Sequence, residues 1–278
     1  MEVVIGAVKL GLIYSLVSLG IFLTLRVIDF PDMSVNSSFT LGAALSGVAL
    51  VNGVNPIVAT IVACIGGSLV GGMTAWLHVA RGIQNLLSGI IVMIGLYSIN
   101  LRVLDKPNLP LLHISTILSG QYSMWILAFI IIAVCCAITY FLLSDIGLAI
   151  RASGQNSRFG EAYGVGRNFT IYSMLALSNG LVALAGSLFS QLEGFVDIGM
   201  GNGILIIGLA SVIIGERLFI SGGVVTAVIG AVVGSVIYRL IIALSLMSSD
   251  LGMRTSDIYL ATSLIIVVMM IGKRKERQ

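Results

Sequence analysis

Long apolar runs separated by short polar stretches are the main pattern of this chain. A membrane-spanning helix needs about 20 predominantly apolar residues, and fewer where a broken helix is sheltered by protein. The candidate spans are residues 3–25, 39–51, 57–79, 86–104, 124–143, 170–190, 198–214, 222–246 and 257–271. We therefore expect an all-α fold, a polytopic transmembrane helical bundle of about 8–9 spans that includes broken or short helices.

Two of these runs are too short for ordinary spans. Residues 39–51 and 198–214 each adjoin a polar stretch that contains glycine or proline, at 26–38 and 193–203. Irregular backbone is tolerated at membrane depth only where it lies against protein or a water-filled pathway. The pattern predicts discontinuous or re-entrant helices at both places.

Composition supports a membrane location and excludes an ordinary soluble domain. Of the 278 residues, 58% are hydrophobic and 10% are charged, whereas soluble domains carry about 25% charged residues. The net charge of +3 is too small to indicate a nucleic-acid-binding surface. The three cysteines lie inside apolar runs without the spacing of metal ligands. We expect one transmembrane domain over residues 1–278, with no metal site.

Basic residues gather in the loops on one side of the predicted membrane. The side that holds the 144–168 loop and the C-terminal tail carries nine of them, whereas the opposite loops carry two. By the positive-inside rule, the first side faces the cytosol. If all nine runs cross the membrane, the N-terminus lies outside. If the second run, at 39–51, is re-entrant and does not cross, the N-terminus lies inside. Both topologies stay open.

Residues 26–39 form the most unusual polar stretch. Pro31 disfavours a helical conformation at Phe30, and a short polar side chain after it can cap a new helix. The stretch is equally compatible with a piece of a translocation route and with a solvated turn at the cytosolic surface. The candidate pathway residues are Asp29, Phe30, Pro31, Asp32, Ser34 and Asn36.

The longest polar insertion, at 144–168, is basic and separates two strong spans. Asn156 is a suitable N-cap for a short helix to about Tyr163, which Gly164 and Gly166 can end in the left-handed conformation. Such a helix would offer its aromatic side chains to a groove on a partner. Taken alone, the composition of the loop favours a solvated segment on anionic lipid headgroups.

Two glycine pairs have the spacing of close helix contacts. Gly67 with Gly71, and Gly230 with Gly234, place two small residues on one helix face. Such pairs let helix backbones approach closely in a membrane. We expect both pairs to pack inside the chain rather than at a subunit interface.

Three separated motifs share a known pattern. The insertion reads Gly147…Arg151-Ala152-x-Gly154-x-Asn156…Ala162-x-x-Gly164, and a small-residue helix with Ala-Leu-Ala-Gly at 183–186 follows it. Gly-Leu-Ile-Tyr-Ser-Leu at 11–16 precedes Asp-Phe-Pro at 29–31, and residues 208–216 form a late small-residue segment. In this order, and over essentially the whole chain, the motifs resemble the ABC importer permeases of the branched-chain amino acid and ribose type.

The resemblance implies roles for the insertion and for the N-terminal motif. In that family the insertion is the coupling helix that sits on the ATPase subunit. Asp-Phe-Pro-Asp at 29–32 is similar to the branch that includes tryptophan and tyrosine uptake systems, whereas branched-chain permeases carry Asn-Phe-Ala-His-Gly there. An aromatic amino acid is thus the implied solute. The implied coupling residues are Arg151, Gly154, Asn156, Arg158, Phe159, Glu161, Ala162, Tyr163 and Gly164.

The implied protein is a permease subunit that moves a small solute by alternating access, and not an enzyme. Its implied partners are cytosolic ABC ATPases, a periplasmic or lipid-anchored solute-binding protein, a second permease copy as a homodimer, and the lipid of a bacterial inner membrane. The chain has no G-x-x-x-x-G-K-[ST] motif, so we expect no catalytic residue and no cofactor in it, with ATP used by the partner subunit. A secondary transporter or channel without an ATPase is the alternative, and a membrane scaffold is a third, weaker one.

Overall fold

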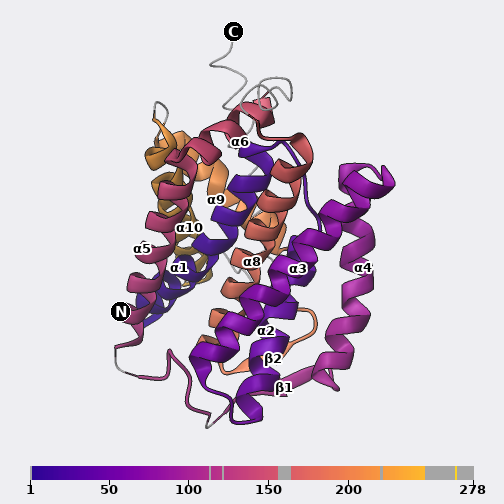
Figure 1. Cartoon of the computed structure of the whole chain (residues 1–278). Coiled ribbons are helices and arrows are strands. Elements are labelled where there is room, and N and C mark those ends of the chain that lie inside the picture. The colour runs from indigo at the N-terminus through magenta and orange to yellow at the C-terminus, as the bar shows by residue number, and fades with distance from the viewer. Residues whose placement is uncertain are drawn as a thin grey trace.

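The computed structural model describes residues 2–112, 114–120, 122–155, 164–219, 222–247 and 267. Helices dominate this part of the chain (Figure 1), as expected from the apolar runs. The elements are α1 (Glu2–Phe22), the π-helical turn η1 (Leu23–Val27), α2 (Val35–Val51), α3 (Pro56–Arg81), α4 (Asn85–Leu104), β1 (Asn108–Pro110), α5 (Ser123–Leu143), α6 (Asp145–Gln155), α8 (Arg167–Glu193), β2 (Phe195–Asp197), α9 (Ile204–Leu218) and α10 (Val224–Met247).

Six helices in the described residues are long and apolar enough to cross a membrane: α1 with η1, α3, α4, α5, α8 and α10. This finding confirms the predicted polytopic helical bundle. Helices α2 and α9 are shorter, with 17 and 15 residues, and each begins after a non-helical stretch. The two predicted short helices are therefore confirmed, while the predicted run at 257–271 lies outside the described residues except for residue 267.

The bundle has two ends, which we call the α6 face and the sheet face after the elements that lie there (Figure 1). The Lys9 Nζ atom donates a hydrogen bond to Ser123 Oγ at 2.8 Å, so α1 and α5 begin at the same end. That end is the sheet face, where β1 and β2 pair. The α1 helix therefore starts opposite α6, and α2 together with the segment before it completes a passage across the bundle.

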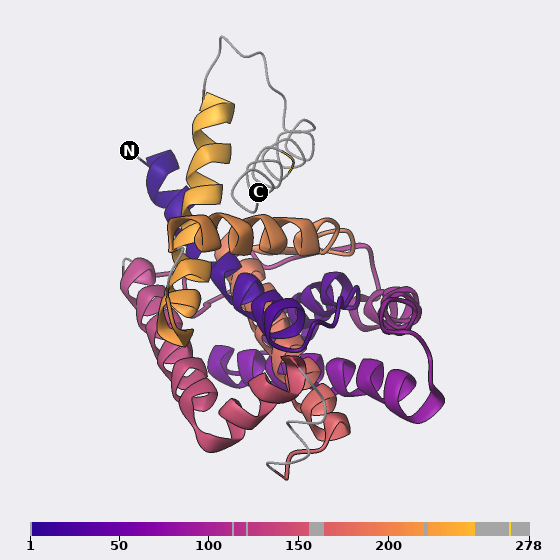
Figure 2. The same cartoon turned by 90° about the horizontal axis from the view of Figure 1, so that it is seen from above.

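Among the six long helices, α8 and α1 are the most buried. In windows of 18 residues, 72% of α8 and 61% of α1 are buried, against 28% of α4 and 22% of α5. Both views place α4 and α5 at opposite edges (Figures 1 and 2). The α8 helix packs on α1, α2 and α3, so a side chain in the middle of α8 can link several elements.

Close helix contacts depend on the predicted glycine pairs. A β-carbon on Gly71 would overlap the Leu175 carbonyl oxygen of α8, and one on Gly67 would overlap Asn179. Gly234 lies in the same way against the Ser211 carbonyl of α9. Both pairs thus pack inside the chain, as expected, and dispersion and close backbone approach hold these helices together.

A small antiparallel sheet at the sheet face was not predicted. Strand β1 pairs with β2, with Leu109 opposite Val196. The Leu111 amide also donates to the Gly194 carbonyl at 2.8 Å. The strands have three residues each, which is too short to produce a period-two pattern in the sequence. The sheet ties the loop after α4 to the turn after α8.

Candidate functional site

The polar stretch at 28–34 leaves the helical path and turns into the bundle. Helix η1 ends at Val27, and the Phe30 amide donates to the Thr24 carbonyl at 2.8 Å. Asp29 has a φ of 50°, an uncommon left-handed conformation for a residue other than glycine. Asp29 and Pro31 are exposed, whereas Phe30 and Asp32 are buried. The break predicted at Pro31 is therefore present, and the segment alternates between a surface and the interior.

Asp32 is the centre of a buried polar cluster. Its carboxylate is only 1% exposed. The Oδ1 atom accepts hydrogen bonds from the Ser34 amide at 2.8 Å and the Ser34 hydroxyl at 2.6 Å, and Oδ2 accepts one from Asn179 Nδ2 at 2.7 Å. Burial of a charge is costly unless such partners compensate it. The solvated-turn interpretation is therefore wrong for Asp32, although Asp29 and Pro31 in the same segment are exposed.

The cluster joins the break to α2, α3 and α8. Asn179 Oδ1 of α8 accepts a hydrogen bond from the Ser38 hydroxyl of α2 at 2.6 Å, and the Thr74 hydroxyl of α3 lies 3.2 Å from Ser34 Oγ. Asn179 and Thr74 were not predicted, because each lies in an apolar run. Asn179 could have been found as a polar side chain in the middle of a span, which is rare without a function or a partner.

Asn36 joins the two broken helices. We expected Asp32, Ser34 or Asn36 to cap α2, but the N-cap residue Ser34 makes no side-chain capping bond. Instead, Asn36 Oδ1 accepts from the Leu205 amide in the first turn of α9 at 2.9 Å. This bond satisfies one of the free amides at the start of α9. The beginnings of α2 and α9 therefore lie together inside the bundle.

We predict that Asn36→Ala weakens the start of α9. Loss of a capping acceptor costs about 0.5–2 kcal/mol, so the midpoint of thermal unfolding should fall and the amides at 204–207 should exchange hydrogen faster. Asn52→Ala is the matched control, since the exposed Asn52 side chain bonds only within its own helix, to Val48. Unchanged hydrogen exchange at 204–207 would show that the bond to Leu205 does not hold this helix start.

The predicted coupling insertion contains a helix that the sequence analysis did not anticipate. Helix α6 occupies residues 145–155, whereas we expected a helix to begin at Asn156. Asn156, Arg158, Phe159, Glu161, Ala162 and Tyr163 lie outside the described residues. Gly164 has a φ of 77°, as predicted, but Gly166 is extended and precedes α8. Arg151 lies on α6 and is half-buried.

The end of α6 touches the start of the polar stretch at 28–34, which we call the re-entrant segment. A β-carbon on Gly154 would overlap the Val27 carbonyl oxygen and would lie 3.2 Å from Ile28 Cα. Only glycine permits this approach. The structure thus places Gly154 of the coupling set against the backbone that leads into Asp29 and Phe30 of the pathway set. We call this contact the α6 joint.

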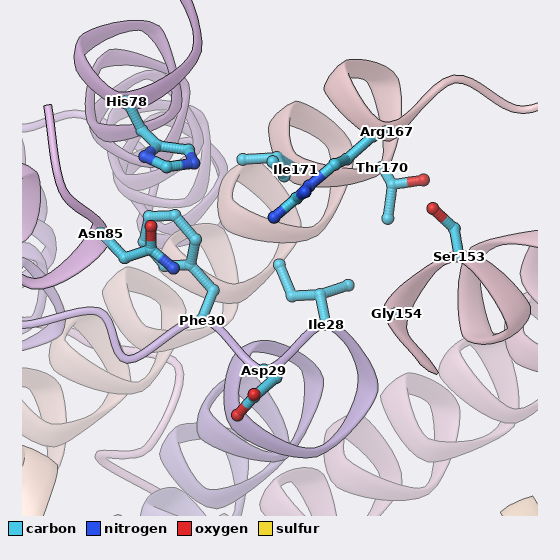
Figure 3. Close-up of a pocket in the computed structure, with 10 residues that line it drawn as sticks. All are labelled: Ile28, Asp29, Phe30, His78, Asn85, Ser153, Gly154, Arg167, Thr170 and Ile171. Atoms are coloured by element: carbon cyan, nitrogen blue, oxygen red, sulfur yellow. The ribbon is translucent and has the colours of Figure 1, made fainter. Parts of the chain in front are cut away.

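A cavity of about 320 Å³ lies beside the α6 joint. Figure 3 shows its walls, which come from the re-entrant segment, α3, α4, α6 and α8. Asp29 and Phe30 from the pathway set and Gly154 from the coupling set line it together. Pro31, Asp32, Ser34 and Asn36 are not among its lining residues.

An ion pair ties the far side of the re-entrant segment to α9. Arg26 and Glu216 pair through their side chains, with Arg26 Nη2 2.8 Å from Glu216 Oε2. The two side chains are 41% and 33% exposed, so the pair contributes at most about 1 kcal/mol. It positions the end of η1 rather than holding the fold.

The architecture is that of a multi-pass helical membrane protein with two helices that begin inside the bundle, which is typical of transporter permeases. The chain matches the family model described as "Branched-chain amino acid transport system / permease component" over residues 3–272. It belongs to this family. The resemblance expected from the motifs is thereby confirmed, and the protein is a transporter permease subunit.

The chain is also similar in sequence to two individual proteins. The tyrosine transport system permease protein of Clostridioides difficile (strain R20291) is 38% identical over 271 residues, which cover 97% of this chain and 91% of the relative. The uncharacterized protein RP368 of Rickettsia prowazekii (strain Madrid E) is 32% identical over 226 residues, covering 80% of this chain and 79% of the relative. No solved structure matches the chain.

Proposed function

We propose that this chain is the membrane subunit of an ABC importer that takes up an aromatic amino acid, with tyrosine as the expected solute. The membership in a permease family supports the class. The solute follows from the relative described as a tyrosine transport permease, to which nearly the whole chain is similar. The Asp-Phe-Pro-Asp sequence at 29–32 agrees with this branch of the family.

The α6 joint is the observation that carries the coupling mechanism. Two separate cytosolic ATPases would bind at the α6 face, on Arg151, Gly154 and the 156–164 segment. Because Gly154 lies against the backbone at Val27 and Ile28, a displacement of α6 must move the re-entrant segment or open the contact. The ATPases would favour one of two permease states through such contacts.

The re-entrant segment would pass this displacement to the pathway. Asp32 is bonded to Asn179 in α8, and Asn36 is bonded to the start of α9. A shift of residues 28–36 therefore acts on both broken helices at once. We propose that these helices change their positions around a route shared with a second permease copy, in a homodimer.

The remaining partners follow from the two faces. The basic loops support a cytosolic α6 face in a bacterial inner membrane. A periplasmic or lipid-anchored binding protein would then deliver the solute at the sheet face. The chain itself would use no cofactor and no metal, because ATP would be hydrolysed by the partner subunits.

Reconstitution tests this proposal. The chain, the ATPase and the binding protein encoded beside it are placed in vesicles, and labelled tyrosine uptake is measured with ATP on the α6 side. We expect uptake that requires all three proteins and ATP. Uptake by the chain alone along an ion gradient would overturn the ATPase coupling and support a secondary transporter, and no uptake of tyrosine or tryptophan would overturn the solute.

A further inference from the structure

One arginine lies inside the membrane span of α10 without an acidic partner. Arg239 is half-buried and falls within the span Val224–Ser245. Its guanidinium group makes no ion pair and no hydrogen bond with any described residue, and its Nε atom is buried. A charge at membrane depth lacks the bulk water that solvates a surface arginine, and such a charge is rare unless it faces a partner or a pathway. The expected partner of Arg239 is therefore an anion.

The guanidinium group of Arg239 lies well inside the membrane. It lies 4.5 Å from the centre of the Tyr14 ring of α1. Tyr14 is about 16 Å along the helix from Val3, where the span of α1 begins, and the hydrocarbon core of a bilayer is about 30 Å thick. The arginine is thus held against the middle of α1, so a reach to the membrane surface does not explain its position.

Three aromatic rings from three helices meet beside this arginine. Tyr14 stacks on Phe39 of α2, and Phe189 of α8 contacts both, with its ring centroid 5.9 Å from that of Tyr14 and 5.6 Å from that of Phe39. Tyr14 and Phe39 are buried, whereas Phe189 is half-buried. The Arg239 guanidinium and the Phe189 ring are at most about 10 Å apart, because they lie 4.5 and 5.9 Å from the Tyr14 ring centre. One aromatic amino acid spans such a distance.

The two broken helices begin close to the same rings. Phe39 lies one turn after the start of α2, and Tyr14, Phe39 and Ile204, the first residue of α9, belong to one hydrophobic cluster. The N-terminal end of a helix carries a partial positive charge, and in transporters the ends of discontinuous helices point at anionic groups of the solute. Neither α2 nor α9 has an acidic residue in its first turn. The helix starts and Arg239 therefore both favour an anion here.

We propose that Arg239 binds the carboxylate of the aromatic amino acid during its passage, with the ring of the solute against Phe189. A guanidinium group can form two parallel hydrogen bonds with a carboxylate. The half-buried Phe189 offers the solute ring an aromatic contact. This inference rests on the proposed function and adds the place at which the permease itself recognises the solute.

Binding of labelled L-tyrosine to the full chain in phosphatidylcholine nanodiscs tests the site without transport. Desaminotyrosine keeps the carboxylate and should displace tyrosine, whereas tyramine lacks the carboxylate and should do so at least about tenfold more weakly. No tyrosine binding, or competition by tyramine equal to that by desaminotyrosine, would overturn the site. Displacement of tyrosine by phosphatidylglycerol in the nanodiscs would assign Arg239 to a lipid headgroup and would also overturn it.

Two variants with matched controls locate the contacts. Arg239→Gln should weaken tyrosine binding by about tenfold or more and should make desaminotyrosine and tyramine equally weak competitors. Arg102→Gln is the control, since Arg102 is an exposed arginine in the last turn of α4. Phe189→Leu should weaken binding by about threefold, and Phe129→Leu, at an exposed position of α5, should not. Unchanged binding in Arg239→Gln would overturn the carboxylate contact, and unchanged binding in Phe189→Leu the ring contact.

Thermal stability separates this role from a purely structural one. Arg239→Gln removes a charge that no described carboxylate pairs with, so the midpoint of thermal unfolding in detergent should not fall. A lower midpoint with unchanged tyrosine binding would show that Arg239 only holds the fold. If this variant does not fold, the competition between desaminotyrosine and tyramine on the unmodified chain still decides.

Uptake in the reconstituted importer separates the site from the proposed function. Arg239→Gln should lower tyrosine uptake by about tenfold or more, and Arg102→Gln should leave it unchanged. Normal uptake in Arg239→Gln would overturn the site and leave the proposed function in place. Absence of uptake by the unmodified importer, with tyrosine binding intact, would overturn the proposed function alone.

Discussion

Replacement of Gly154 with valine is expected to abolish ATP-driven uptake while the protein still inserts into the membrane. Even a methyl group at this position would overlap the Val27 carbonyl oxygen. Overpacking of such a contact costs about 1–3 kcal/mol, and the chain relieves it by moving one element away from the other. Helix α6 would then be displaced from the re-entrant segment, so a movement of α6 would no longer reach residues 28–36.

The measurement is labelled uptake together with ATP hydrolysis in the reconstituted importer. We expect uptake to fall at least about tenfold in Gly154→Val. Uptake by Gly154→Ala should lie between that of Gly154→Val and that of the unmodified chain. ATP hydrolysis should be retained but no longer coupled to transport. Gly166→Val is the control, since a β-carbon there meets no atom within 4 Å and its φ of −67° suits any residue. Normal uptake in Gly154→Val would show that the α6 joint does not transmit the movement.

The two breaks in the bundle could be predicted because each has a strong local cause. Pro31 disfavours a helical conformation at Phe30, and the runs at 39–51 and 198–214 are too short to span a membrane alone. The polar residues at 26–38 and 193–203 mark the same places. Local chemistry was enough for these features, and the structure adds that the two helix starts meet through Asn36 and Leu205.

The contacts that build the candidate site could not be predicted in the same way. Asn179 and Asp32 are 147 positions apart, and their hydrogen bond depends on how α8 is rotated against the re-entrant segment. That rotation is set by packing at residues such as Gly71 and Gly67, which the sequence shows only as small residues on one helix face. A single sequence contains the spacing of such residues but not the helix that they contact.

Arg239 shows the same limit for a charged side chain. A lone arginine near the expected end of a span is usually explained by its reach to the membrane surface. In the structure its guanidinium group lies 4.5 Å from the centre of the Tyr14 ring. The Tyr14 ring in turn stacks on the Phe39 ring, with the two ring centroids 6.2 Å apart. The arginine is therefore held against the aromatic interior of α1 and α2. The identity of its neighbour depends on the packing of α10 on α1.

Loss of the Asp32 carboxylate is expected to disrupt both stability and transport, whereas loss of the Asp29 carboxylate leaves stability unchanged. Asp32→Ala removes the acceptor of three hydrogen bonds and leaves the Ser34 amide and one amide hydrogen of Asn179 buried without that partner. Each unsatisfied group costs about 1–3 kcal/mol. The midpoint of thermal unfolding in detergent should therefore fall by about 4 °C or more. Asp29→Ala serves as the control for stability, because Asp29 is exposed.

Exchanging the side chains of Asp32 and Asn179 tests whether their hydrogen bond itself is needed, rather than each residue separately. Asp32→Asn places a second amide group against Asn179 Nδ2, and Asn179→Asp places a second carboxylate against Asp32, so each single variant should be strongly destabilised. The double variant again pairs one carboxylate with one amide and should regain part of the lost thermal stability. A coupling energy of about 1 kcal/mol or more in this cycle is expected for groups in direct contact.

Transport measured in the same cycle decides whether the cluster only holds the fold or also takes part in the movement. If Asp32 merely anchors the re-entrant segment, uptake should recover in the double variant in step with stability. If the bond between Asp32 and Asn179 must break and reform as α8 and the re-entrant segment move, uptake should stay low although part of the stability returns. The reason is that residue 179 then has no amide group to donate to the Leu175 carbonyl. We expect the second result, since this cluster lies between the α6 joint and both broken helices.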